Sequence, residues 1–431
     1  MSPFRSWRRS LSTAVGHRRS GRTERGDGGR PRENTFTMKL ALIGFGQAGG
    51  KVVDQFLAYD ERVDGGFVEA AIAVNTATTD LQGLERVPRS NRILIGQARV
   101  NGHGVGADNE LGAEVAEADI DEVQHAIDDV PTHEVDAFLV VAGMGGGSGS
   151  GGAPVLARHL QRIYTQPVYG LGILPATDEG GLYTLNAGRS FRTFVREVDN
   201  LLVFDNDAWR SAGESVEGGY DRINREIVER FGLLFAAGEV GSGDAVAESV
   251  VDSSEIINTL SGGGVSTIGY ATETVETSAS GLLSSLSSSK GSKHDGTDLD
   301  TDGAATNRLT SLVRKATLGR LTLPCDVSSA DRGLVVASGP AEELSRKGVE
   351  RGRTWLEEET GSMEIRGGDY PTGGDEVGAI VLLSGVTDVP RIDRLQQVAV
   401  EAKETTEDVR TRSQEGTAAL VDTSGELDAL F

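Results

Sequence analysis

Residues 145–151 read Gly-Gly-Gly-Ser-Gly-Ser-Gly and follow directly on the apolar stretch 135–142. Five glycines in seven positions let the backbone form a nest whose N–H groups can surround an anion. The hydroxyls of Ser148 and Ser150 can add two more donors. A helix is expected to begin near Gly152, so the segment is a tight strand-to-helix turn and not a linker. The sequence therefore predicts a phosphate-binding loop here.

A second glycine-rich turn lies near the start of the folded chain, where residues 44–51 read Gly-Phe-Gly-Gln-Ala-Gly-Gly-Lys. Its Gly-x-Gly-x-x-Gly spacing follows the apolar stretch 39–43 and suits phosphate binding at a helix N-terminus. Dinucleotide-binding folds share this spacing, but they usually carry an acid at the end of the second strand, where this chain has Asn75. A P-loop is excluded because Val52 follows Lys51 where Ser or Thr is required.

The wider pattern predicts an α/β fold with a Rossmann-like parallel sheet, a long central helix and a smaller α/β C-terminal domain. Continuous apolar runs are typical of strands covered by helices on both faces. The expected strands are 39–43, 67–74, 92–96, 135–142, 167–174, 200–205, 317–327, 332–338 and 376–385. The expected helices include 114–128, 184–199, 217–238, 341–358 and 390–406.

Five sections follow from this pattern. Residues 1–37 carry nine Arg and three acids in an otherwise acidic chain, so we expect a disordered basic extension, with Met38 as the true start. The remaining sections are a nucleotide-binding domain at 38–215, a central helix at 216–240, a C-terminal domain at 241–408 with a flexible insertion at 274–305, and an acidic tail at 409–431.

Composition limits the partners. The formal net charge is −23 and the pI about 4.7, so the surface repels the phosphate backbone of nucleic acids. Only seven of the 42 basic residues are Lys, and an acidic, lysine-poor surface suggests a halophilic source. The single cysteine, Cys325, excludes an internal disulfide and fits a cytoplasmic protein. No run of eighteen apolar residues occurs, so no membrane span is predicted.

The 145–151 loop resembles the glycine signature of the tubulin and FtsZ superfamily, and the resemblance extends over 38–408. The Gly46-Gln47-Ala48-Gly49 wording and the ending at 427–431 resemble the archaeal tubulin-like group called CetZ. The resemblance implies a GTPase that polymerises head to tail into filaments, with GTP or GDP and Mg²⁺ as cofactors. It also implies control of cell shape.

The resemblance also implies nucleotide-binding roles for other loops. Asn75 and Thr76 match the second phosphate loop, and residues 104–109 match the loop that senses the γ-phosphate, where Asp108 could have a magnesium-linked role. Glu179 is the expected ribose contact. The nucleotide-contacting residues expected from the motifs and the resemblance together are Gly46, Gln47, Ala48, Gly49, Asn75, Gly104, Gly106, Ala107, Asp108, Asn109, Gly145, Gly146, Gly147, Ser148, Gly149, Ser150, Glu179, Asn206, Tyr220 and Asn224.

Three of these residues are expected at the base. Asn206 matches the position that hydrogen-bonds the nucleotide in this superfamily. Tyr220 and Asn224 match the stacking aromatic residue and the guanine-reading amide of the central helix, and their four-residue spacing puts them on one helix face. Tyr220 also fits plain core packing.

Asp252 and Glu255 resemble the superfamily loop whose acids help water attack the γ-phosphate bound by a neighbouring subunit. A carboxylate can orient or deprotonate such a water. The alternative is a capping box, with Asp252 as the N-cap and Glu255 at the third helical position. Val250 stands where FtsZ usually has Asn. The metal ligands stay open.

Two other functions remain. A GTP-binding regulator that does not polymerise is compatible with Val250, and an NAD-dependent oxidoreductase is compatible with the first glycine turn alone. The expected partner is a second copy of the chain. The tail at 409–431 ends Leu-Asp-Ala-Leu-Phe and could dock on an adaptor as a short helix, or could be simply disordered.

Overall fold

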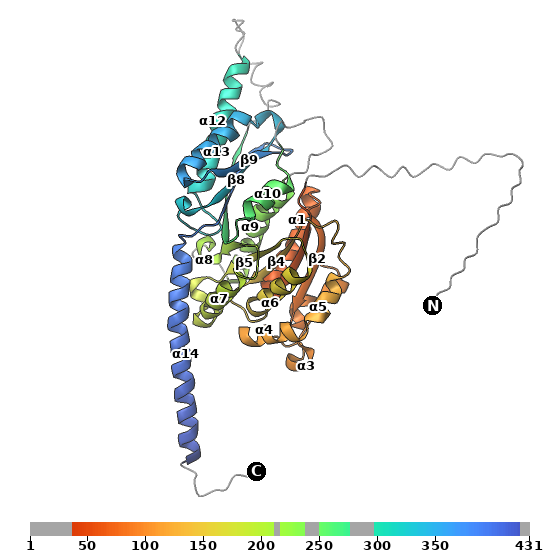
Figure 1. The fold of residues 1–431 in the computed structure, drawn as a ribbon, viewed down its shortest axis with the longest axis vertical. Coiled ribbons are helices and arrows are strands. Elements are labelled where there is room, and N and C mark those ends of the chain that lie inside the picture. The colour runs from red at the N-terminus through yellow and green to blue at the C-terminus, as the bar shows by residue number, and fades with distance from the viewer. Residues whose placement is uncertain (1–36, 211–215, 238–249, 276–296, 423–431) are drawn as a thin grey trace, which may run out of the picture. The chain divides into compact units, whose positions relative to one another are not determined.

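The computed structural model describes residues 37–210, 216–237, 250–275 and 297–422 (Figure 1). The chain divides into two units, Met1–Asn34 and Thr35–Phe431. The first unit lies outside the described residues, so the expectations for the basic extension and for Met38 as the start remain predictions.

One ten-stranded sheet runs through the described residues in the order β3-β2-β1-β4-β5-β6-β7-β10-β8-β9. Neighbours from β3 to β7 are parallel, β10 is antiparallel to both β7 and β8, and β9 is parallel to β8. The strands are β1 (Leu40–Phe45), β2 (Val68–Asn75), β3 (Arg92–Leu94), β4 (Ala137–Gly143), β5 (Val168–Leu174), β6 (Asn200–Asp205), β7 (Val265–Thr274), β8 (Arg332–Gly339), β9 (Glu364–Pro371) and β10 (Glu376–Ser384).

Helices cover both faces of this sheet, which confirms the predicted α/β class. They are α1 (Gly46–Val63), α2 (Thr78–Gln82), α3 (Gln97–Val100), α4 (Asn109–Ala118), α5 (Ile120–Ile127), α6 (Ser148–Ile163), α7 (Gly181–Phe194), α8 (Asn206–Trp209), α9 (Val216–Ala236), α10 (Ser253–Leu260), α12 (Thr297–Leu318), α13 (Arg346–Thr360) and α14 (Pro390–Asp422). One core cluster contains apolar residues of α1, α9 and α10, and the other contains those of α4 to α7 and α12 to α14.

The central helix α9 agrees closely with the expected 217–238. Its buried face carries Ile223, Ile227 and Phe231 at four-residue steps. Phe235 continues this face and packs near the rings of Phe56 in α1 and Phe231. This aromatic contact fixes α9 against α1.

The two halves of the sheet join at a narrow seam between β6 and β7. Only Leu201 with Val265 and Leu202 with Ser266 are paired there. Buried polar side chains reinforce the seam. Asn200 accepts a hydrogen bond from the Ser266 hydroxyl at 2.7 Å and donates one to the Ser384 hydroxyl at 3.0 Å.

Several expected elements were wrong in the C-terminal half. The strand expected at 317–327 is not formed, because α12 occupies the chain up to Leu318 and a loop follows. The strands β7 and β9 were missed, and β7 carries the two buried polar residues Ser266 and Thr267 that weaken an apolar signal. The expected insertion at 274–305 overlaps the end of β7 and the start of α12, and 276–296 lies outside the described residues.

Two helix boundaries also need correction. The helix expected over 114–128 is two helices, α4 and α5, which meet at Asp119. The side chain of Asp119 accepts a hydrogen bond from the Gly96 amide at 2.5 Å, which ties this junction to the loop after β3. Helix α14 continues far beyond the expected 406, so the tail expected from 409 is helical up to Asp422. Residues 423–431 lie outside the described residues.

Candidate functional site

A cavity of about 760 Å³ opens where the loops after β1, β2, β4, β5 and β6 meet. These loops follow the carboxyl ends of parallel strands, which is where open α/β sheets bind ligands. Sixteen of the twenty expected nucleotide-contacting residues line it: Gly46, Gln47, Ala48, Asn75, Gly104, Gly106, Ala107, Gly145, Gly146, Gly147, Ser148, Gly149, Glu179, Asn206, Tyr220 and Asn224.

The other four expected residues support the cavity from behind. Gly49 packs against the Val141 carbonyl of β4, where a Cβ would lie only 2.1 Å from the oxygen. Asn109 is buried at the start of α4. The Ser150 hydroxyl donates within its own turn to the Gly146 carbonyl. Asp108 accepts hydrogen bonds of 3.0 Å from the Glu110 and Leu111 amides, so it caps α4 and does not line the cavity.

The two glycine loops touch one another at one end of the cavity. We call this the phosphate end, because both motifs predict phosphate binding there. Gly46 has φ of +74°, a conformation that glycine adopts without strain, and a Cβ there would lie 2.7 Å from the Gly149 nitrogen. The Ser148 hydroxyl lies 2.6 Å from the hydroxyl of Thr76, which joins the second phosphate loop to the start of α6. The loops that the sequence assigned separately therefore form one cradle.

Asp80 is an acid at this end that sequence reasoning missed. It lines the cavity and accepts hydrogen bonds from Asn75 at 3.0 Å and from Gln47 at 3.3 Å. An acid in the first helical turn after a phosphate loop is the signal that could have identified it. Among the described residues, no three His, Cys, Asp or Glu side chains gather as a metal site.

The opposite end of the cavity carries the expected ribose and base residues. Glu179 accepts a hydrogen bond of 2.7 Å from the Ala176 amide. Tyr220 lies against Glu179, and burial together with this carboxylate raises the pKa of Tyr220 to about 12. The Asn206 side chain is 6 % exposed, and its Oδ1 atom has no hydrogen-bond partner in the described structure. A buried acceptor without a partner is costly, so this end of the cavity suits a ligand that donates a hydrogen bond.

Arg391, the second residue of α14, holds this end together. Its Nε atom lies 3.1 Å from Oδ1 and 3.2 Å from Oδ2 of Asp205, and its Nη2 atom donates to the Pro175 carbonyl at 2.8 Å. The two side chains are 10 % and 3 % exposed. Burial raises the pKa of Asp205, and Arg391 opposes that rise. Nothing in the sequence indicates a pairing across 186 positions.

The expected catalytic acids do not line this cavity. Asp252 is the N-cap of α10 and accepts a hydrogen bond of 3.1 Å from the Glu255 amide, as the capping alternative predicts. The Glu255 side chain instead pairs with Arg366 of β9, at 3.0 Å between Oε2 and Nη1. These two side chains are 36 % and 39 % exposed. Arg366 is a partner that sequence reasoning missed.

The cavity and α10, the helix that Asp252 caps and that contains Glu255, lie at opposite ends of the parallel strands. The first residue of β6, Asn200, donates to the carbonyl of Leu260 at the end of α10. Asn206, just beyond the other end of β6, lines the cavity. In Figure 1, α10 lies above the parallel strands, whereas α4, which follows the 104–108 loop, lies below them.

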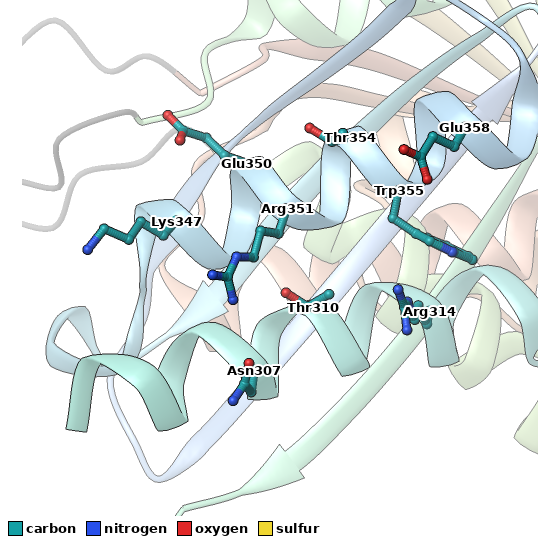
Figure 2. A pocket seen from close by; sticks show the side chains of 9 residues that line it. All are labelled: Asn307, Thr310, Arg314, Lys347, Glu350, Arg351, Thr354, Trp355 and Glu358. Carbon is teal, nitrogen blue, oxygen red and sulfur yellow. The ribbon is translucent and has the colours of Figure 1, made fainter. Parts of the chain in front are cut away.

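A second hollow of about 770 Å³ lies between α12 and α13 (Figure 2). Arg314 stacks over the Trp355 ring at 5.4 Å from its centroid. The lining also includes Lys347 and Arg351 beside Glu350 and Glu358, so its charge favours neither anions nor cations. None of the expected site residues lies there.

None of the described helices combines the length and the apolar character needed to cross a bilayer.

Comparison with known families divides the chain in two. A family described as "Tubulin/FtsZ family, GTPase domain" matches residues 39–214. A second, described as "Tubulin-like CetZ, C-terminal domain", matches residues 213–401. Together the two matches span the described sheet.

Individual proteins match over most of their length. The tubulin-like protein CetZ1 of Haloferax volcanii is 68 % identical over 377 residues, which cover 86 % of this chain and 94 % of that protein. The tubulin-like protein CetZ of Pyrococcus abyssi is 32 % identical over 385 residues, covering 88 % of this chain and 94 % of that protein.

Two solved structures share the fold. The GDP-bound CetZ1 monomer from Haloferax volcanii has a TM-score of 0.74 and 65 % identity, covering 85 % of this chain and 100 % of that one. The GTPγS-bound CetZ2 protofilament from the same organism has a TM-score of 0.75 and 47 % identity, covering 86 % of this chain and 100 % of that one.

Proposed function

This chain belongs to the CetZ group of the tubulin/FtsZ family and carries its GTPase domain, and on that premise we propose that it binds GTP in the cavity described above and hydrolyses it when copies stack head to tail. The active site is then complete only where one copy presents Asp252 and Glu255 to the nucleotide of the next. The single observation behind this proposal is that the cavity lies at one end of β6 and α10, the helix that Asp252 caps and that contains Glu255, lies at the other.

Guanine suits the base end of the cavity. Guanine carries an exocyclic amino donor that adenine lacks at the same position, and the buried Oδ1 atom of Asn206 needs a donor. Asn224 is 7 % exposed and lines the same end, with Tyr220 four residues before it for stacking. Relatives with GDP and GTPγS bound are compatible with this proposal.

Mg²⁺ fits the phosphate end through Asp80. Mg²⁺ usually takes one or two carboxylates and completes its coordination with substrate phosphates and water. Asp80 is a carboxylate that lines the phosphate end, whereas Asp108 is occupied as a helix cap. Bound there, the ion would neutralise phosphate charge. Asp80 would hold the ion, and hydrogen bonds from Asn75 and Gln47 would position the Asp80 carboxylate.

In the assembled state Glu255 orients or deprotonates the water that attacks the γ-phosphate. Asp252 holds the first turn of α10 through the Glu255 amide and so fixes where the Glu255 side chain begins. Arg366 holds the carboxylate in position until the neighbouring subunit arrives. Loss of the γ-phosphate would then release the 104–109 loop and weaken the contact between copies.

The cellular output belongs to the same proposal. We propose control of cell shape in a halophilic cytoplasm, with the acidic composition and the scarcity of Lys as support for the halophilic part. The tail at 409–431 would connect filaments to an adaptor. Removing 420–431 should leave assembly in vitro unchanged and alter filament placement in cells.

The decisive experiment measures GTP turnover per subunit across protein concentration in high salt, beside sedimentation of the same samples. Turnover should rise steeply at the concentration where the protein begins to pellet. Full turnover in dilute, non-sedimenting protein would refute the shared site. GTP binding with neither pelleting nor turnover would favour the alternative function, a GTP-binding regulator that does not polymerise, with which Val250 is compatible.

A further inference from the structure

The loop expected to sense the γ-phosphate has an unusual backbone. Gly104, Gly106 and Ala107 have φ of +81°, +60° and +62°, so a non-glycine residue sits in the left-handed region. Such a residue needs support from its surroundings to keep this conformation. The support at Ala107 comes from another element.

Asn186 of α7 contacts the 104–109 loop and the glycine loop at 145–151. Its amide nitrogen donates to the Ala107 carbonyl at 2.7 Å and to the Gly145 carbonyl at 3.0 Å. An Asn amide has two hydrogens, so these two bonds use both. The side chain is 2 % exposed, which excludes water as an easy replacement partner.

Helix α7 is held rigidly enough to place this amide. Arg189, one turn further, pairs with Glu110 of α4 at 2.9 Å. Gly188 packs against α14, where a Cβ would lie 2.6 Å from that of Ala399. A side chain on an anchored helix fixes its partners more accurately than one on a loop.

The two bonds also orient the peptides. In a trans peptide the C=O and the following N–H point in opposite directions. With its carbonyl toward Asn186, the Gly145–Gly146 peptide directs its N–H away from that side chain. Asn186 thus sets the orientation of one donor of the glycine loop while it holds the 104–108 loop beside it.

We propose that Asn186 is a positioning residue that locks the γ-phosphate loop onto the glycine loop and so sets the preference of the cavity for triphosphate over diphosphate. This inference rests on the proposed GTP function. GDP has no phosphate at the 104–109 loop, so losing the lock weakens GTP more than GDP.

The test compares Asn186→Leu, which keeps the size but removes both donors, with Thr184→Val as a matched control. Thr184 is also buried in α7, and its hydroxyl bonds only within the helix, to the Gly180 carbonyl at 3.1 Å. Affinities for GTPγS and GDP are measured on protein too dilute to sediment. Asn186→Leu should weaken GTPγS about tenfold and GDP less than threefold, as expected for losing one or two net hydrogen bonds. Thr184→Val should leave the ratio of the two affinities unchanged.

Equal weakening of both nucleotides, or no change in the ratio, would overturn the proposal, because a general packing role moves both affinities together. Asn186→Ser keeps one donor and should give an intermediate ratio. If Asn186→Leu does not fold, the Ser variant decides by the same criterion. Failure of the wild type to bind either nucleotide would instead refute the proposed function.

Discussion

Two arginine–carboxylate pairs in this molecule have nearly the same N–O distance in opposite environments. Arg391 and Asp205 lie 3.1 Å apart beside the nucleotide cavity and are 10 % and 3 % exposed. Arg366 and Glu255 lie 3.0 Å apart on the far side of the strands and are 39 % and 36 % exposed. Because the first pair is buried, we expect it to contribute to the stability of the fold. Exposure leaves the carboxylate of the second pair available for chemistry at a contact between copies.

Breaking the buried pair should have the largest effect. Arg391→Met leaves Asp205 as a buried charge without its partner, so we expect a loss of about 3–5 kcal/mol in the free energy of unfolding. Urea denaturation followed by circular dichroism measures this loss. The double variant Asp205→Leu with Arg391→Met is the control and should recover most of it. A loss below about 1 kcal/mol would mean that the pair is weaker than its burial indicates.

Removing the exposed carboxylate should affect turnover and not folding. Glu255→Ala should lower GTP turnover per assembled subunit about 100-fold or more, as for the loss of a general base, while unfolding changes by less than about 1 kcal/mol. Phosphate release is measured beside sedimentation. Wild-type protein added to a variant filament should restore turnover only at contacts where a wild-type copy presents Glu255 to the nucleotide of its neighbour. Wild-type turnover by the variant alone would end the trans-acid proposal.

The smallest expected effect is a difference between the two pairs in how their contribution to stability depends on salt. Arg366→Gln removes the exposed ion pair and should cost about 1 kcal/mol or less at low salt, and nothing measurable in molar salt, where screening acts over about 3 Å. The loss caused by Arg391→Met should persist in the same molar salt. Paired denaturation curves at both salt concentrations provide the measurement. A salt-insensitive Arg366→Gln effect would contradict the comparison.

Local signals explain what the sequence predicted well. The glycine loops at 44–51 and 145–151 act through their own backbones, so their composition alone indicates phosphate binding. The parallel strands of the first half are continuous apolar runs, and each was placed within a few residues. The helix α9 shows its apolar face at regular spacing. The family match then confirmed the GTPase assignment.

Long-range pairings explain what was missed. Strand β7 contains buried Ser266 and Thr267, whose hydroxyls are satisfied by Asn200 and by Thr322, far away in sequence. The sequence does not show these partners, so its local pattern does not predict a buried strand here. The roles of Arg391, Arg366 and Asn186 likewise depend on residues 41 to 216 positions away. Asp108 caps α4, and the sequence alone does not separate this role from that of a metal ligand, because both use the same residue type in the same loop.

The seam between β6 and β7 has a mechanical consequence. Tension along a filament of such subunits passes from one half of the sheet to the other through two paired positions and the small polar network around Asn200. Apart from β2 and β3 at the sheet edge, which share three pairs, the other neighbouring strands share six to nine, so stiffness drops sharply at this line. We expect each subunit to flex there first, which would let a polymer curve while both halves keep their internal shape.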